Sequence, residues 1–141
     1  LTALTAQVVE EFEDMGEAVS FPGGERITLP LRPTWLRRAL RNLISNALRH
    51  GGGSAEVTLI RAPGSVTITV TDNGPGLPEH DIARMLEPFT RGEPSRNRST
   101  GGAGLGLTLA RAIAEQHGGS LHLANRAGSG GLAASLTLPL I

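Results

Sequence analysis

The chain has 141 residues, 39% of them hydrophobic, and its 13 basic residues, all arginine, balance 13 acidic residues. This length suits one domain with a hydrophobic core of its own, and the near-zero net charge argues against a nucleic-acid binder that neutralises phosphates. The absence of cysteine excludes disulfides and thiolate sites, and the absence of lysine excludes the lysine-dependent phosphate loop and the protein-kinase site.

The first half of the chain alternates helical and strand patterns. Its predicted elements are a helix at 1–14, short strands at 17–21 and 26–31, and a long helix from Thr34 to about His50. Pro33 suits the first position of the long helix, and the glycines at 51–53 end it. Because the chain begins inside a helical pattern, we interpret it as part of a longer protein.

The second half predicts strands at 55–62 and 65–72, a short helix at 79–86, a loop at 87–103, a helix at 104–117, and strands at 120–125 and 132–140. The loop is rich in Gly, Ser, Arg and Pro and has no periodicity, which is typical of a flexible functional loop. The strand pairs around "PGG", "PGS" and "RAGSGG" predict hairpins. The fold class is therefore α/β, with a mixed sheet covered by helices on one face and no doubly wound parallel sheet.

The long helix carries an unusual polar face. Asn42, Asn46, Arg49 and His50 fall within about 100° of one another, away from the apolar stripe. Asparagine is a poor helix former, and its carbonyl oxygen is a ligand suited to Mg²⁺. A solvated face with two neutral amides explains the same pattern equally well.

The strand at 65–72 places a carboxylate at the end of an apolar face. Asp72 follows the alternation of Val66, Ile68 and Val70, so we expect it to point into the interior, where a carboxylate needs hydrogen-bond donors. The amino group of an adenine is one such donor, and Gly74 and Gly76 would let a flat ring approach closely. The alternative is a "DNG" hairpin turn, although a helical segment follows in place of a returning strand.

The loop and the glycines after it suit a phosphate site without lysine. The loop carries Phe89, Arg91, Arg96 and Arg98 and runs into a glycine-rich helix start. Backbone amides at a helix N-terminus bind anions, and arginines can bind phosphate oxygens through two N–H groups. A merely flexible loop before a glycine-rich helix fits this segment equally well.

Together these segments resemble the ATP-binding domains of sensor histidine kinases. The stretches "NLISNALRHG", "DNGPGLPEHD", "EPFTRGEPSR" and "GGAGLGLTLARAIAEQHGGSL" are similar to the N, G1, F and G2 boxes of that family. The family belongs to the Bergerat-fold group, with gyrase, mismatch-repair ATPases and a heat-shock chaperone. The resemblance implies an α+β two-layer sandwich over 1–141: a mixed, mainly antiparallel five-stranded sheet with three helices on one face.

The resemblance also implies roles for the residues of the first two boxes. Asn46 would coordinate Mg²⁺, with Asn42 beside the metal and the phosphates. Arg49 would reach the phosphates, and His50 stands where the family often has an aromatic residue against adenine. Asp72 would accept the adenine amino proton, in a pocket shaped by the two glycines that follow it.

For the other two boxes, the resemblance implies an ATP lid at about 87–103. Phe89 would anchor this lid, and Arg91 with Arg96 or Arg98 would approach the terminal phosphates. The phosphate-facing loop would be formed by Gly102, Ala103, Gly104, Leu105 and Gly106. Ala103 is a departure, because the family frequently has threonine there; the change removes a hydroxyl and keeps the backbone amide.

By resemblance, the chain would bind ATP with Mg²⁺ and pass the γ-phosphoryl group to a histidine of a separate dimerisation domain, which feeds a response regulator. The acceptor histidine itself is not expected in this chain. In the family it is followed by an acidic residue and, five positions on, by a proline; His80-Asp81 starts this pattern, but Met85 stands where the proline would be. The ATPase relatives carry glutamate where Asn42 stands, and an amide cannot be a general base. An ATPase and a regulatory serine kinase or non-catalytic nucleotide-binding module stay as alternatives.

The setting of the domain is also an expectation from resemblance. The isolated domain would be a monomer, and the full-length protein a homodimer. The domain would lie in the cytoplasm as part of an inner-membrane sensor, without direct membrane contact, since no apolar run here approaches the length of a membrane span. Neither composition nor motifs indicate a nucleic-acid partner.

Overall fold

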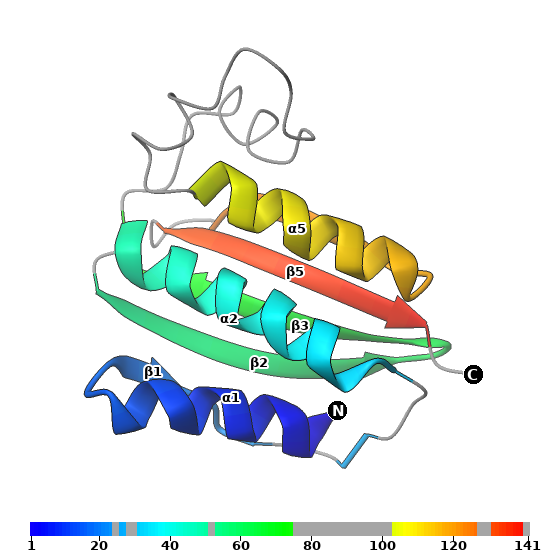
Figure 1. Ribbon diagram of the computed structural model, residues 1–141, viewed down its shortest axis with the longest axis horizontal. Helices are drawn as coiled ribbons and strands as arrows, with labels where there is room; N and C mark the ends of the chain where they lie inside the picture. The colour runs from blue at the N-terminus through cyan, green and yellow to red at the C-terminus, as the bar shows by residue number, and fades with distance from the viewer. Residues whose placement is uncertain (24–25, 28–30, 51–52, 75–102, 127–130, 140–141) are drawn as a thin grey trace.

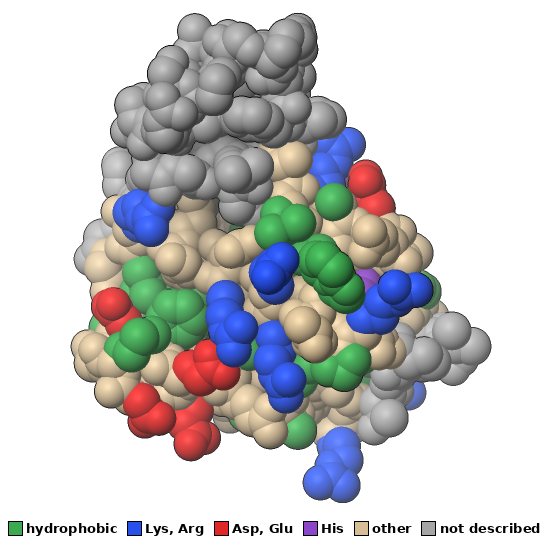
Figure 2. Space-filling model, in the orientation of Figure 1, with side chains coloured by type: hydrophobic (Ala, Val, Ile, Leu, Met, Phe, Trp, Pro, Cys, Tyr) green, Lys and Arg blue, Asp and Glu red, His purple; other side chains and the backbone are tan. Residues whose placement is uncertain are grey.

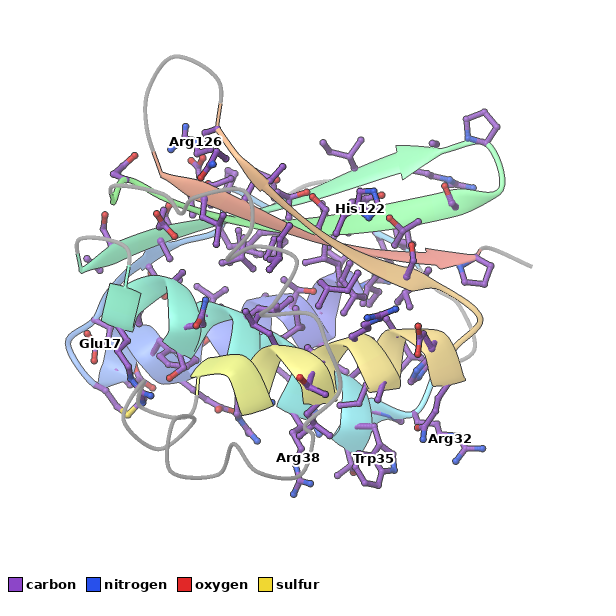
Figure 3. The ribbon with its side chains drawn as sticks, turned by 90° about the horizontal axis from the view of Figure 1, so that it is seen from above. Glu17, Arg32, Trp35, Arg38, His122 and Arg126 are labelled. Carbon is purple, nitrogen blue, oxygen red and sulfur yellow. The ribbon has the colours of Figure 1, made fainter. Side chains whose placement is uncertain are left out.

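The computed structural model describes residues 1–23, 26–27, 31–50, 53–74, 103–126 and 131–139. The elements are α1 (Thr2–Asp14), β1 (Ala18–Ser20), α2 (Pro33–His50), β2 (Ser54–Ala62), β3 (Ser65–Asp72), α5 (Ala103–Gln116), β4 (Ser120–Asn125) and β5 (Leu132–Pro139). The three helices of the described residues lie side by side on one face of the sheet (Figure 1), and the view from above separates the two layers (Figure 3). The predicted helix at 79–86 and loop at 87–103 lie outside the described residues, apart from Ala103.

The five strands form one mixed sheet in the order β1-β2-β3-β5-β4. β1 pairs with β2 in parallel, and the other three pairs are antiparallel. The predicted hairpins β2–β3 and β4–β5 are both confirmed. The sheet is therefore mixed and mainly antiparallel, as the resemblance implied.

The described residues do not form the predicted hairpin at "PGG", and residues 24–25 and 28–30 of this segment lie outside them. β1 pairs with Ser54–Glu56 at the start of β2, and the described residues Arg26, Ile27 and Leu31 belong to no strand. The backbone of Ile27 instead binds the first two residues of the chain. The amino group of Leu1 donates to the carbonyl oxygen of Ile27 at 2.8 Å, and the Ile27 amide donates to Thr2 Oγ1 at 2.9 Å. Ile27 is buried and closes the core beside α1 instead of extending a sheet edge.

The core lies between the sheet and the helices. Its largest fully buried side chains are Leu36, Leu40, Leu43, Ile44, Val8, Val57, Val66, Ile68, Leu107, Ile113, Leu136 and Leu138. In α2 they follow the 3.6-residue period, and in β3 and β5 every second residue is buried. On the other face of the sheet, here called the outer face, hydroxyl pairs such as Thr67–Thr137 at 3.1 Å link neighbouring strands.

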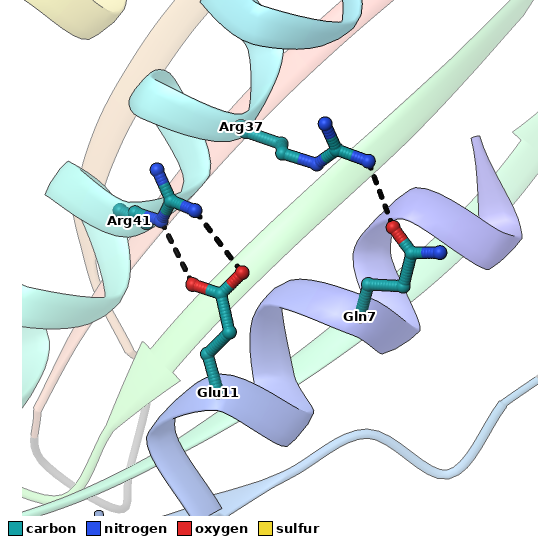
Figure 4. Close-up of polar contacts among 4 residues, drawn as sticks. All are labelled: Gln7, Glu11, Arg37 and Arg41. Carbon is teal, nitrogen blue, oxygen red and sulfur yellow. Dashed lines mark hydrogen bonds and ion pairs between the residues drawn. The ribbon is translucent and has the colours of Figure 1, made fainter.

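Polar contacts also join α1 to α2. Arg41 donates from Nε and Nη2 to the two carboxylate oxygens of Glu11 at 2.9 and 3.0 Å, and Arg37 donates to Gln7 at 2.8 Å (Figure 4). Arginine side chains gather over the middle of this helical face (Figure 2). The hydrogen bond from Arg41 lowers the pKa of Glu11, despite a small opposing effect of burial, and neighbouring positive charge lowers it further.

A histidine links the end of α5 to the start of α2. His117 Nδ1 lies 2.8 Å from the carbonyl oxygen of Ile113, and its Nε2 accepts a hydrogen bond from the backbone amide of Arg32 at 3.0 Å. The ring therefore carries its proton on Nδ1 when both bonds form. This contact holds the segment that leads into Pro33 against α5. In the part of the chain that the structure describes, no helix is both long and apolar enough to cross a membrane.

Candidate functional site

Three element ends meet at one end of the molecule. α2 ends at His50, β2 begins at Ser54, and Ala55 pairs with Asp72 at the end of β3. The first turn of α5 lies at the same end (Figure 1). The structure describes parts of three of the four sequence boxes, the N, G1 and G2 boxes. Residues from these three are brought to this end of the molecule, although up to about 60 residues separate them in the chain.

The polar face of α2 flanks this place. Asn42 and Asn46 are half-buried, and Arg49 is exposed near the end of the helix. Leu43 and Ala47, which are buried, fix the rotation of the helix and so the direction of the two amides. Asn42 and Arg49 each interact with another residue.

The side-chain carbonyl oxygen of Asn46, Oδ1, is buried and has no hydrogen-bond donor among the described residues. A buried acceptor without a partner costs roughly 1–3 kcal/mol, so such an atom is uncommon unless a ligand satisfies it. An amide oxygen is a hard ligand of the kind that Mg²⁺ takes alongside phosphate oxygens and water. The side-chain oxygen of Asn46 is therefore suited to bind a magnesium ion.

Asp72 is buried, with 6% of its surface exposed, as the strand pattern predicted. Its Oδ1 accepts two backbone hydrogen bonds, from Gly74 at 3.0 Å and from Leu132 at 3.1 Å. Neither bond uses Oδ2. The carboxylate is thus held in one orientation by the backbone of two segments, which leaves its second oxygen to act as an acceptor at the end of β3.

The alternative of a "DNG" hairpin turn does not describe this segment. A hairpin turn at Asp72 would require the next strand along the chain to pair with β3. The two strands that pair with β3 are instead β2, which precedes it, and β5, which lies about 60 residues further along the chain. Gly74 donates to Asp72 from two residues away, which is an Asx-type turn.

The glycine-rich start of α5 is described only in part. The helix begins at Ala103, so the backbone of Ala103, Gly104, Leu105 and Gly106 forms its first turn. The amides of a first helical turn have no partner inside the helix and carry partial positive charge. Six predicted site residues lie outside the described residues: Gly76, Phe89, Arg91, Arg96, Arg98 and Gly102. The side chain of His50 is likewise not described.

Sequence reasoning missed the residues that hold Asp72 from the far strands. Leu132, at the start of β5, supplies a backbone amide, and Arg126, just after β4, donates from Nη1 to the Asp72 carbonyl oxygen at 2.9 Å. No sequence signal marks a backbone amide as a donor. For Arg126 the only available signal was its place directly after a strand, which by itself indicates nothing.

Comparison with known proteins matches residues 31–141 to the family of histidine kinase-, DNA gyrase B- and HSP90-like ATPases. The chain belongs to this family. The signal transduction histidine-protein kinase AfsQ2 of Streptomyces coelicolor is 40% identical over 123 residues, 87% of this chain and 23% of AfsQ2. The sensor histidine kinase CpxA of Escherichia coli is 38% identical over 134 residues, 92% of this chain and 28% of CpxA. The chain spans about a quarter of the length of these relatives.

Solved structures show the same fold. The ATP binding domain of PrrB from Mycobacterium tuberculosis superimposes with a TM-score of 0.80 at 28% identity, over 99% of this chain and 93% of that one. The histidine kinase domain of the Escherichia coli osmosensor EnvZ gives a TM-score of 0.70 at 30% identity, over 100% of this chain and 86% of that one. The predicted fold and the predicted family, histidine kinase catalytic domains that bind ATP, are confirmed.

Proposed function

We propose that this chain binds Mg²⁺–ATP where α2, β3 and α5 meet, and that within a longer sensor kinase it phosphorylates a histidine. The observation that carries the proposal is Asp72, a buried carboxylate at an element end, with Oδ1 held by two backbone amides. Its second oxygen, Oδ2, accepts neither of these two bonds, and we assign it to the bound base. The 6-amino group of adenine supplies a donor of the right kind.

Asn46 is our candidate ligand for Mg²⁺, because its buried Oδ1 has no donor among the described residues. Bound there, Mg²⁺ would neutralise charge on the phosphates of ATP. Asn42 lies one helical turn earlier on the same face of α2 and would contact the phosphates beside it. Arg49, near the end of the same helix, would add a positive charge that reaches them.

The remaining phosphate contacts come from the other two boxes. The backbone amides of the first turn of α5, from Ala103 to Gly106, are suited to phosphate oxygens. The ATP lid would be residues 87–103, with Phe89 as its anchor and with Arg91 and either Arg96 or Arg98 at the terminal phosphates. Gly76 would shape the adenine pocket together with Gly74, and Gly102 would belong to the phosphate-facing loop. These roles rest on the family resemblance.

The residue at position 42 bears on the chemistry that we propose. Asn42 stands where ATPase relatives carry glutamate, and an amide cannot deprotonate water. Positioning and charge neutralisation suffice for transfer to an imidazole, whose unprotonated nitrogen forms the new bond to the γ-phosphorus while the bond to the bridging oxygen breaks and ADP leaves.

The partners and location of the whole protein belong to the same proposal. The acceptor histidine would lie on a separate dimerisation domain of a homodimer, and a response regulator would take the phosphoryl group from it. The isolated 141-residue chain would be a monomer that binds ATP. The domain would work in the cytoplasm, as part of a sensor held in the inner membrane.

Titration calorimetry with Asp72→Asn tests the proposal. Asparagine has nearly the same shape and keeps an acceptor for the amides of Gly74 and Leu132, but its NH₂ group would face the adenine amino group, donor against donor. We expect ATP affinity to fall at least about tenfold, the worth of a hydrogen bond to a charged group. Asp14→Asn, an exposed change at the end of α1, is the matched control. Equal ATP affinity of the two variants, with intact circular dichroism spectra, would overturn the assignment.

A further inference from the structure

Arg126 binds the end of β3 although it follows β4, two strands away. Its Nη1 donates to the carbonyl oxygen of Asp72 and to Oδ1 of Asn73, both at 2.9 Å. The sheet order places β5 between β3 and β4, so the side chain reaches across the start of β5. Figure 3 shows Arg126 in the sheet layer, at the end of the molecule where β4 ends.

The start of β5 contacts Asp72 as well, and there it binds the carboxylate. The Leu132 amide donates to Asp72 Oδ1 at 3.1 Å, and the Gly131 carbonyl oxygen accepts from the backbone amide of Arg126 at 2.9 Å. Gly131 has φ +90°, and a Cβ there would overlap the Asp72 carbonyl oxygen. The end of β4 and the start of β5 therefore fix both the main chain and the carboxylate of Asp72.

The guanidinium group lies away from the adenine side of Asp72. Arg126 lines a hollow of about 430 Å³ together with Glu56, Thr71 and Asn73. Thr71 precedes Asp72 in β3, so its side chain points to the outer face while that of Asp72 points to the helices. Arg126 thus contacts the main chain of Asp72 on the side away from the helices. It could affect a bound base only by changing the position of Asp72.

We propose that Arg126 is a positioning residue for base recognition: it fixes the main chain of Asp72 and Asn73 so that the Asp72 carboxylate meets the 6-amino group of adenine. The inference rests on the proposed function of Asp72. Both hydrogen bonds come from a single nitrogen, Nη1, and a lysine ammonium, with three donors, has enough donors to make both. Alanine cannot, and it leaves the Asp72 carbonyl oxygen free to move.

The test compares ATP with inosine triphosphate, which carries a carbonyl where adenine has its 6-amino group. Affinities of the 141-residue chain for both nucleotides are measured by calorimetry for the wild type, Arg126→Ala and Arg126→Lys. Arg37→Ala, which removes one arginine on the helical face, is the matched control. Urea unfolding of each variant monitors the fold separately.

We expect Arg126→Ala to lower the ratio of ATP to inosine triphosphate affinity by about fivefold, the worth of one hydrogen bond. Arg126→Lys should restore the ratio to within about twofold of the wild type, and Arg37→Ala should leave it unchanged. General damage to the fold would lower both affinities together and leave the ratio as it was. That result, or an unchanged ratio in a stable Arg126→Ala, would overturn the inference. A wild type that does not prefer ATP would overturn the proposed role of Asp72, and the inference with it.

Discussion

Replacement of Gly131 by alanine tests how tightly the start of β5 packs against Asp72. Gly131 is buried and has φ +90°, a left-handed conformation that side chains disfavour. An added Cβ would lie closer than 3.0 Å to the Asp72 carbonyl oxygen, which is closer than real Cβ contacts come. It would also lie 3.1 Å from Asp72 Oδ1. Either β5 or the end of β3 must move to make room for it.

Two costs add up at this position. The left-handed conformation costs a residue with a Cβ roughly 1–2 kcal/mol. Overpacking against a backbone atom costs about 1–3 kcal/mol more, because backbone yields less easily than the end of a side chain. We therefore expect the free energy of unfolding to fall by roughly 2–5 kcal/mol, a large part of the stability of a domain of this size.

Gly64 provides the matched control. It has φ +78° in the turn between β2 and β3, and a Cβ there would meet nothing within 4 Å. Gly64→Ala should therefore cost only the conformational share, about 1–2 kcal/mol. Urea unfolding followed by circular dichroism gives the free energy of unfolding for both variants, with equal slopes if the unfolded states are alike.

The difference between the two variants isolates the packing against Asp72. If Gly131→Ala is no more destabilising than Gly64→Ala, the close approach of β5 to Asp72 is not a constraint on the fold. The nucleotide ratio provides a second readout: a displaced Asp72 should reduce the preference of Gly131→Ala for ATP over inosine triphosphate. Gly64→Ala, at the opposite end of β3, should keep that preference.

Two further outcomes are expected. Asn46→Leu removes a buried oxygen that has no donor among the described residues, so it should cost less than about 1 kcal/mol of stability while abolishing the Mg²⁺ dependence of ATP binding in calorimetry; an unchanged Mg²⁺ titration would refute the metal role. Glu11→Gln should lower the free energy of unfolding by less than about 0.5 kcal/mol at neutral pH, because both partners of the Glu11–Arg41 pair are about half exposed. The pKa of Glu11 is lowered by the Arg41 hydrogen bond, so this contribution is present above the ordinary pKa of the group and disappears as the pH falls through the lowered value. A difference between wild type and variant that persists in urea unfolding at about pH 2 would contradict this account.

Much of the site could be predicted because it depends on local periodicity. The 3.6-residue period of α2 separates its apolar stripe from the face that carries Asn42 and Asn46. The two-residue period of β3 turns Asp72 toward the core. Each assignment needs only a few neighbouring residues, because the direction of a side chain follows from its position in the element.

The pairing of β1 could not be obtained in this way. "EAVSF" and "RITLPL" both suit a strand and the turn between them suits a hairpin, yet β1 pairs in parallel with β2 and Ile27 packs beside α1. Propensity indicates that a segment can form a strand, but packing against the rest of the core selects its partner. The link from His117 to Arg32 likewise joins residues 85 positions apart, which no local pattern reports.

The sequence by itself determined which residue types are present and which way α2 and β3 present them: two amides on one helical face, and one carboxylate at the inner end of a strand. Only the tertiary structure decided that Asp72 is held by Leu132 and Arg126, and that Asn46 Oδ1 is buried without a donor among the described residues. The physical reason is that hydrogen bonds depend on distances between atoms. Those distances are set when the registers of β5 on β3 and of β4 on β5 bring residues 60 and 54 positions apart into contact.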